Sequence, residues 1–309
     1  MGIAAGVRVL EHLPEPAALA VGERAGQLAA FLWPRRRRIA RANLAAAFPG
    51  WDAGKRERVL DAHLRLLGRT AAAWLRLASL PDQEILALLE WEGLPLLEKA
   101  LERGRGALVV TAHYGCFELI LPGLRARLAP RRVTAVSRAQ PNPQLRALFD
   151  ERRRRSAGAA TLPQNALAIQ RALRSGTAVG LLADHYRSQR RGGLLVPFLG
   201  KRAWTNPGPA ILALRTGSPL ILAHTRPLTD RRHLVTIGPE IVPAQTGQRA
   251  SDIAAVTERL NDVIGAWIRE RPELWLWAHR RFRDSPDLGG ATLETGAGPG
   301  RGRSPITLG

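Results

Sequence analysis

The stretch "ALVVTAHYGCFELILPGL", residues 107–124, joins an apolar, partly β-branched run to a cluster of reactive side chains. His113, Gly115, Cys116 and Glu118 all fall within six residues directly after the run. A short apolar run is typical of a buried strand, although periodicity alone does not separate it from a buried helix. In parallel sheets, ligands bind beyond the carboxyl ends of the strands. The stretch therefore predicts a buried strand with a functional site at its end.

The rest of the chain supports an α/β fold. Residues 1–90 have helical spacing of apolar side chains, and from residue 105 short apolar runs alternate with helical patterns. We expect a single domain with a central, mostly parallel sheet flanked by helices, preceded by an N-terminal helical segment. The further strand runs are 131–137, 177–184, 219–225 and 233–242, and the helical patterns are 143–155, 164–174 and 251–270.

Three parts of the chain are expected from these patterns. Residues 1–90 form a helical, membrane-associating part, and residues 91–283 form the α/β core. Residues 284–309 are rich in Gly, Pro, Thr and Ser and have no apolar periodicity, so we expect a disordered tail there.

Composition limits the partners that the protein can have. The 309 residues are 45% hydrophobic, which is enough for a sizeable core. Lys and Arg number 46 against 26 Asp and Glu, and the resulting charge of +20 attracts nucleic acid, anionic lipid or an acidic carrier protein. The single cysteine excludes an intrachain disulfide and a cysteine-based zinc site. The seven histidines lack paired ligand spacing, so we expect neither a metal nor a cofactor.

The N-terminal region contains an apolar segment that is too interrupted to cross a membrane. Residues 17–33 are mostly apolar, but Glu23, Arg24 and Gln27 break the run, and the basic run 35–38 follows Pro34. This pattern favours a helix that lies on a membrane surface. An ordinary amphipathic core helix with a solvated basic end explains the same pattern equally well.

His113 and Glu118 can meet only if the backbone bends between them. On one continuous helix they would lie about 140° apart around the axis. A turn with Gly115 at positive φ would bring Glu118 into the first turn of a helix, close to His113. A carboxylate near a histidine fixes its tautomer, so the pair could act as a general base on a hydroxyl. Two other interpretations stay open: a purely structural histidine, and a Cys116 nucleophile activated by His113.

Several blocks of the sequence, in order, resemble the lipid A biosynthesis lauroyl/myristoyl acyltransferases of the lysophospholipid acyltransferase superfamily. The 113–118 stretch matches the family's His-x4-Asp/Glu motif. The others are "RRRRIARANLAAAFPG" (35–50), "SRAQPNPQL" (137–145), the segment 181–221 that begins "LLADHYRSQRR" and contains "VPFLG", and "PELWLWAHRRFR" (272–283). One departure is His185, which follows Asp184 where the family usually has glutamine.

The resemblance implies an O-acyltransferase that moves a fatty acyl chain from an acyl carrier protein thioester to a hydroxyl of a lipid A-type glycolipid precursor. It implies His113 as the general base, with Glu118 orienting its ring. It also implies work at the cytoplasmic face of the bacterial inner membrane, with the protein peripherally or interfacially attached. The positions that the resemblance assigns to substrate binding are Arg138, Asn142, Asp184 and Arg280.

Other functions remain possible at this level. A related activity is transfer from a coenzyme A thioester to another glycolipid or phospholipid, such as a phosphatidylinositol mannoside. A basic, non-catalytic protein that binds membranes or nucleic acid would also fit the charge. The basic residues are dispersed and no known nucleic-acid-binding module is present, so we expect no nucleic-acid partner.

Overall fold

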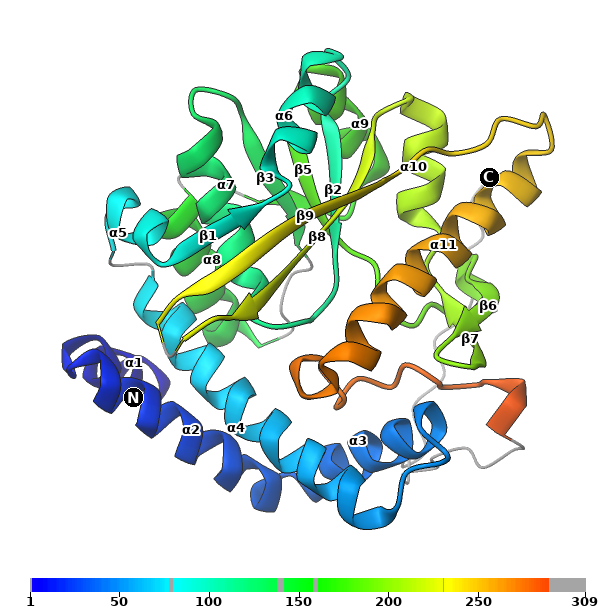
Figure 1. Ribbon diagram of the computed structural model, residues 1–309. Coiled ribbons are helices and arrows are strands. Elements are labelled where there is room, and N and C mark those ends of the chain that lie inside the picture. Colours follow the sequence, from blue (N-terminus) through cyan, green and yellow to red (C-terminus); the bar gives the residue numbers. More distant parts are fainter. Residues whose placement is uncertain (1, 78–79, 138–141, 158–160, 230, 289–309) are drawn as a thin grey trace.

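The computed structural model describes residues 2–77, 80–137, 142–157, 161–229 and 231–288. A seven-stranded sheet forms the centre, in the order β1-β9-β8-β2-β5-β3-β4, and a separate two-stranded sheet pairs β6 with β7. Figure 1 shows helices on both faces of the large sheet, with the N-terminal helices α2, α3 and α4 gathered along one side. The α/β fold with an N-terminal helical region is therefore confirmed.

All five predicted strands form. They are β2 (Ala107–Thr111), β3 (Val133–Ser137), β5 (Ala178–Leu182), β8 (Leu220–Pro227) and β9 (His233–Ile241). Neighbours pair in parallel except β8 and β9, which are antiparallel, so the sheet is mostly parallel. The strands not anticipated are β1 (Leu89–Glu92), β4 (Leu162–Pro163), β6 (Leu194–Phe198) and β7 (Lys201–Thr205).

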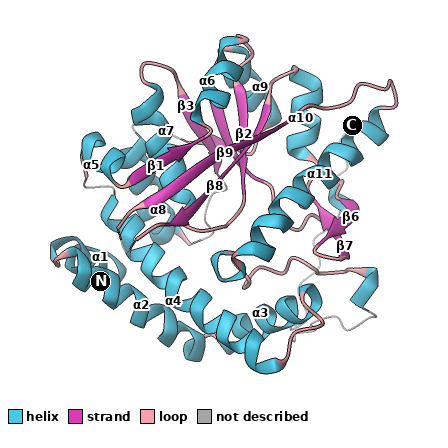
Figure 2. Ribbon diagram, viewed as in Figure 1, coloured by secondary structure: helices cyan, strands magenta, loops and turns pink. Residues whose placement is uncertain are grey.

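Helices surround this sheet, as Figure 2 shows in cyan. Those before the first strand are α1 (Gly2–His12), α2 (Glu15–Leu32), α3 (Pro34–Ala47), α4 (Ala53–Leu77) and α5 (Asp82–Ala87). Those that follow are α6 (Leu94–Glu102), α7 (Ile120–Leu128), α8 (Pro143–Ala157), α9 (Ala166–Arg174), α10 (Gly208–Thr216) and α11 (Arg249–Glu270). The helical patterns predicted at 143–155, 164–174 and 251–270 correspond to α8, α9 and α11.

The core lies on both faces of the sheet. Along β2, Leu108 and Val110 join a cluster with residues of α9, α10 and α11, whereas Ala107 and Val109 join one with residues of α5, α6 and α7. Successive side chains of a strand point to opposite faces, so a strand covered on both sides must be apolar throughout. This is why β2 reads as an uninterrupted apolar run.

The N-terminal helices pack closely because glycines face each other between α2 and α4. A Cβ atom on Gly26 would lie 2.1 Å from the carbonyl oxygen of Leu64, and one on Gly68 would lie 2.1 Å from that of Gly22. Side chains at these positions would therefore push the two helices apart. Among the described helices, none has both the length and the apolar character needed to cross a bilayer.

The C-terminal boundary of the fold differs from the expectation. Residues 284–288 were expected to belong to the tail, but they include a 3-10 turn, Pro286–Leu288. Asp287 binds the Arg202 side chain, with oxygen–nitrogen distances of 2.7 and 2.9 Å, and Ser285 donates a hydrogen bond to the Arg202 carbonyl. These five residues belong to the fold, and the rest of the predicted tail lies outside the described residues. The predicted division at residue 90 stays a prediction.

Candidate active site

The turn that follows β2 has the bend that the sequence requires. Gly115 adopts φ +58°, and a Cβ atom there would lie 2.2 Å from the Thr225 carbonyl oxygen, so no larger residue fits. A 3-10 turn over Phe117–Leu119 follows and leads into α7. Glu118 therefore lies in the first helical turn, as predicted.

His113 is hydrogen-bonded to Asp184, which is 71 positions away in the sequence. Its Nδ1 lies 2.9 Å from Oδ1 of Asp184, and its backbone N–H donates to Oδ2 at 3.0 Å. The indole N–H of Trp275 donates to the same Oδ2 at 2.9 Å. Asp184 is only 2% exposed, so these three contacts hold the carboxylate in a fixed place.

Strand pairing brings the two residues together. Thr111 of β2 pairs with Leu182 of β5 in parallel register, and His113 and Asp184 each lie two residues beyond that pair. Parallel strands end at the same edge of a sheet, so the two side chains emerge next to each other. A carboxylate can only accept, so Nδ1 carries the proton and Nε2 is the acceptor atom of a neutral ring.

The charges of the pair stabilise each other. Burial lowers the pKa of His113, but the charge and hydrogen bond of Asp184, with a smaller effect of Glu118, raise it above the ordinary value. Burial alone would raise the pKa of Asp184, yet His113 and the Trp275 hydrogen bond hold it well below its usual range. Asp184 is therefore ionised at neutral pH, and its charge favours the protonated form of the His113 ring.

Glu118 has a different partner from the one expected. Its carboxylate binds the guanidinium of Arg153 on α8, with Oε1 2.7 Å from one terminal nitrogen. Both side chains are less than one fifth exposed. The expected contact between Glu118 and the His113 ring is replaced by Asp184, because strand register places Asp184 at Nδ1. Asp184, expected to bind substrate, has both oxygens occupied by protein donors.

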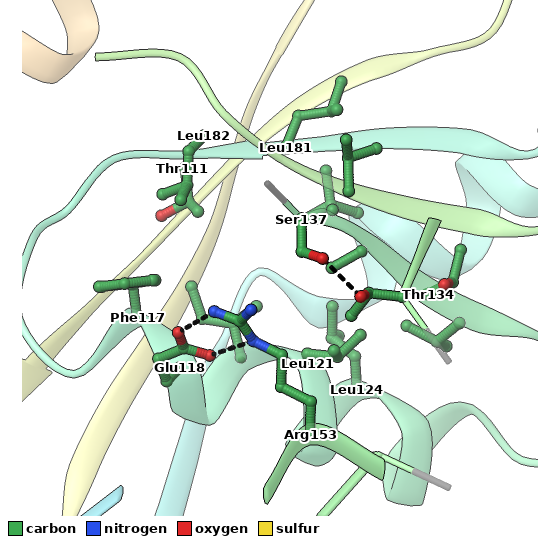
Figure 3. A pocket seen from close by; sticks show the side chains of 17 residues that line it. Thr111, Phe117, Glu118, Leu121, Leu124, Thr134, Ser137, Arg153, Leu181 and Leu182 are labelled. Carbon is green, nitrogen blue, oxygen red and sulfur yellow. Dashed lines mark hydrogen bonds and ion pairs between the residues drawn. The ribbon is translucent and has the colours of Figure 1, made fainter. Parts of the chain in front are cut away.

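The Glu118–Arg153 pair lies in the wall of an apolar pocket (Figure 3). The pocket lies between α7 and one face of β2, β3 and β5, and its volume is about 620 Å³, including space open to solvent. Phe117 also lines the pocket, and the rings of Phe117 and His113 are in edge contact at 5.1 Å. The pocket therefore begins beside the candidate base. Sequence reasoning missed Arg153, whose only signal is the basic run 152–155.

Two more histidine rings, those of His185 and His279, lie next to His113 in a row. The rings of His113 and His185 are 4.5 Å apart, and those of His185 and His279 are 4.8 Å apart. His279 Nε2 accepts the backbone N–H of Tyr186 at 3.1 Å, and burial lowers the pKa of His279 to about 3, so this ring is neutral. In the described part of the chain, His113, Asp184 and His185 form the one group with ligand atoms close enough for a metal ion. Two members of this group, His113 and Asp184, are already hydrogen-bonded to each other.

The C-terminal signature 272–283 holds the site in place. The Leu276 N–H donates to the His113 carbonyl at 3.0 Å, and the Gly115 N–H donates to the Leu274 carbonyl at 2.9 Å. Arg281 is fully buried, and its guanidinium lies 4.3 Å from the centre of the Phe198 ring and donates to Thr205 Oγ1 at 2.7 Å. Arg281 is therefore a structural residue that ties the signature to the β6–β7 hairpin.

The remaining candidates have mixed outcomes. Arg138 lies outside the described residues. Asn142 is exposed, and its side chain accepts the N–H groups of Gln144 and Leu145, so it caps α8. Partial burial, followed by the charges of Arg35, Arg283 and Arg36, lowers the pKa of Arg280, which marks a concentration of positive charge. Cys116 is 1% exposed, and burial raises its pKa to about 12.

A histidine–carboxylate pair beside an apolar pocket has the geometry to act as a general base on a hydroxyl. A buried thiol with a pKa near 12 is protonated at neutral pH, and this gives no support to a Cys116 nucleophile. Residues 2–284 match the model of the bacterial lipid A biosynthesis acyltransferases, and the chain belongs to that family. It is therefore an acyltransferase. The hypothesis of a non-catalytic protein that binds membranes or nucleic acid is rejected.

Curated relatives agree with this membership. The chain is 29% identical over 283 residues to the lipid A biosynthesis palmitoleoyltransferase of Escherichia coli K12, covering 89% of this chain and 88% of the relative. It is 26% identical over 282 residues to the lipid A biosynthesis lauroyltransferase of the same organism, with the same coverage. It is also 26% identical over 282 residues, again with 89% and 88% coverage, to the phosphatidylinositol mannoside acyltransferase of Mycolicibacterium smegmatis.

Proposed function

We propose that this acyltransferase moves a fatty acyl chain from an acyl carrier protein thioester to a hydroxyl of a lipid A-type glycolipid precursor. The hydrogen bond from His113 Nδ1 to Asp184 is the observation that carries the mechanism, because it leaves Nε2 as a base of raised pKa. Family membership and the two Escherichia coli relatives support the substrate classes.

The reaction proceeds through His113 Nε2. The ring takes the proton of the acceptor hydroxyl as its oxygen attacks the thioester carbonyl, and Asp184 stabilises the imidazolium. When the tetrahedral intermediate collapses, the carbon–sulfur bond breaks and the imidazolium returns the proton to the leaving thiolate. The reaction forms an ester and a free thiol without a covalent acyl-enzyme.

The donor chain fits the apolar pocket between α7 and the sheet. The lining is mainly aliphatic, and Phe117 connects the pocket to His113. The Glu118–Arg153 pair is then a positioning element that fixes the first turn after Gly115 and shapes the entrance. Arg138 and the basic cluster around Arg280 remain proposed contacts for substrate phosphates or the acidic carrier.

The membrane side of the proposal concerns the junction of α2 and α3. Phe31, Leu32 and Trp33 are 73%, 65% and 63% exposed, and the basic run 35–38 follows them. Exposed aromatic and aliphatic side chains beside arginines favour attachment to an anionic bilayer surface. We therefore propose peripheral attachment at the cytoplasmic face of the bacterial inner membrane.

A second candidate keeps the mechanism and changes the substrates. The mycobacterial relative is a phosphatidylinositol mannoside acyltransferase at an identity similar to the lauroyltransferase, and this supports another glycolipid acceptor as the alternative. In that alternative the donor is a coenzyme A thioester.

One experiment separates the two candidates. The purified protein is incubated with acyl carrier protein or coenzyme A thioesters and total bacterial lipids, and the acylated product is identified by mass spectrometry. A lipid A precursor that gains an acyl chain only with the carrier protein supports the first candidate, and an acylated mannolipid supports the second. Turnover by a folded His113→Ala variant would refute the base mechanism in both.

A further inference from the structure

An apolar groove runs along the surface formed by α2 and α4, and residues of α3 and of the segment 276–279 also line it. It is open to solvent and its volume is about 1670 Å³. Figure 1 shows the two helices side by side along the lower side of the molecule. At its mouth lie Leu28, Leu32 and Trp33, which are 56%, 65% and 63% exposed. Side chains of this size are seldom left in water together, so the groove is suited to an apolar ligand.

The inner end of the groove reaches the active site. Leu276 and His279 line that end, and Leu276 is the residue whose N–H binds the His113 carbonyl. His279 is separated from His113 by the single ring of His185. A ligand whose chain occupied the groove would therefore carry its polar head to the neighbourhood of the base.

A buried hydrogen-bonding atom without a partner in the described chain belongs to a residue that lines the groove. His63 of α4 is 3% exposed and lines the groove. Its Nδ1 lies 3.2 Å from the Glu273 carbonyl, which can only accept, so Nδ1 carries the proton and Nε2 is an acceptor. Nε2 is buried and has no hydrogen-bond partner within the described chain. Buried polar atoms are nearly always satisfied, so an N–H or O–H donor from outside the described chain is expected at this nitrogen, and we assign it to the ligand.

Positive charge gathers at the same end. Arg36 lines the groove and donates to the Ala278 carbonyl at 3.1 Å, and its charge, with those of Arg35 and Arg283, acts on Arg280. Four guanidinium groups close enough to influence one another favour an anion such as a phosphate. The groove thus combines an apolar length, an acceptor for a proton-donating group and a cationic end.

We propose that this groove binds a hydrocarbon chain of the phosphorylated glycolipid that the enzyme acylates, taken directly from the bilayer. The chain lies along the surface that the packed helices α2 and α4 form together, an amide N–H or hydroxyl of the lipid binds His63 Nε2, and its phosphate lies at the arginine cluster. The inference rests on the proposed function, because it assigns this site to the acceptor of that reaction.

The site gives the acceptor and the donor separate apolar compartments. The donor chain lies in the sheet pocket beside Phe117, and the acceptor chain reaches His113 from the N-terminal helices. The two chains then approach the base from different elements, so they do not compete for one pocket.

Photolabelling with a defined probe tests the location. N-dodecanoylglucosamine 1-phosphate with a diazirine at the end of its chain is added below its micelle concentration, and labelled peptides are mapped by mass spectrometry. We expect labels on α2 and α4, reduced at least tenfold by Ala71→Trp, which fills the groove from an exposed position that lines it. Ala20→Trp, on an exposed position of α2 that does not line the groove, should label like the wild type. Labels confined to β2, β3 and α7, or unchanged labelling of Ala71→Trp, would overturn the proposal.

A second measurement tests His63. The wild-type protein should bind the glucosamine probe about fivefold to tenfold more tightly than dodecyl phosphate, which has the same chain length but no amide or sugar hydroxyl. His63→Phe should reduce this ratio to about one, whatever it does to overall stability, because the ratio compares two ligands on one protein. A ratio that stays unchanged overturns the assignment of Nε2.

Acyl transfer to a lipid A precursor tests the proposed function, and photolabelling of the groove tests the inference, so the two can fail independently. If the wild type transfers an acyl chain to a lipid A precursor but the groove is not labelled, the acceptor binds elsewhere and only the inference fails. If the groove is labelled at the expected peptides but no lipid A precursor is acylated, the assignment of the acceptor fails, and the labelled site belongs to another lipid.

Discussion

Replacing Asp184 by asparagine should abolish most of the turnover while keeping the fold. The amide oxygen can accept the backbone N–H of His113 and the Trp275 indole N–H, as Oδ2 does now at 3.0 and 2.9 Å. In this orientation the amide NH2 group of the new asparagine takes the position of Asp184 Oδ1 and faces His113 Nδ1. Since this group donates, Nδ1 must accept, and the proton moves to Nε2, where the base is needed.

The size of the loss follows from the groups involved. For Nε2 to act as a base in the variant, Nδ1–H must face the amide NH2, which leaves two buried donors unsatisfied at about 1 to 3 kcal/mol each. The total of about 2 to 6 kcal/mol corresponds to a fall in kcat of about 30-fold to 10⁴-fold, and we expect about 10³-fold. Loss of the carboxylate that stabilises the imidazolium acts in the same direction.

The pH dependence of kcat/KM tests the interaction between His113 and Asp184 independently. His113 works as a base only when neutral, so kcat/KM of the wild type falls as pH falls through its raised pKa. Asp184 is the main cause of that increase, so Asp184→Asn should move the acid limb of the residual activity to lower pH. Asp184 itself has a lowered pKa, so its contribution to stability is present above the unfolded value of about 3.9 and is lost as pH falls further.

The assay is acyl transfer from a labelled carrier thioester, with melting temperature measured on the same preparations. Asp252→Asn is the matched control, because Asp252 is also buried and accepts from the Thr246 N–H and hydroxyl, far along the chain from the pair. The control should keep its turnover. Wild-type turnover in Asp184→Asn, or a larger loss in Glu118→Gln than in Asp184→Asn, would refute this account of the base.

Three further outcomes are expected. Cys116→Ala should keep most of the transfer activity, and no hydroxylamine-sensitive acyl-protein should accumulate, because the thiol is buried and protonated; a dead variant would restore the nucleophile hypothesis. Gly180→Val should shift donor preference towards shorter acyl chains, since Gly180 lines the sheet pocket and a Cβ atom there already approaches the Ala135 side chain to 3.3 Å; competition between thioesters of different length measures this, and an unchanged preference counts against the donor pocket. Trp33→Ser should weaken flotation with anionic vesicles, and binding of the wild type should fall as salt rises; equal flotation with neutral and anionic vesicles at low salt contradicts the proposed attachment.

The sequence was sufficient for five of the seven strands of the sheet and for the edge at which the site lies. β2 and β5 are apolar throughout because both faces are covered, and that makes them visible as runs. His113 directly follows the first run and was identified as the candidate base, and Asp184 ends the run 177–184 and was identified as a candidate for substrate binding. Their contact was not predicted, because it depends on the register between strands 71 positions apart. Proximity in sequence favoured Glu118 instead.

The β6–β7 hairpin shows a second limit. Its two turn residues, Leu199 and Gly200, have φ of +51° and +78°, the conformation for which hairpins usually use Asn-Gly or Asp-Gly. Leucine gives no turn signal, and Pro197 within the first strand argues against a strand in the sequence. The hairpin is held by the Asn261 side chain, which donates to the Pro197 carbonyl at 2.8 Å, and by Arg281, which donates to Thr205 Oγ1 at 2.7 Å. Only the folded chain brings Asn261 and Arg281 to the hairpin.

The hydrogen bonds that residues 274–276 make to the turn after β2 and to Asp184 set an order of events during synthesis. Asp184 receives its indole N–H, and the turn at His113 and Gly115 receives its backbone partners, only after this segment has left the ribosome. At that time the N-terminal helices, with their exposed apolar and basic side chains, have long been free to meet a bilayer. Under the proposed attachment, a nascent chain can therefore reach the membrane before the turn at His113 is fully supported, and we expect a chain that is cut short before residue 274 to lack transfer activity.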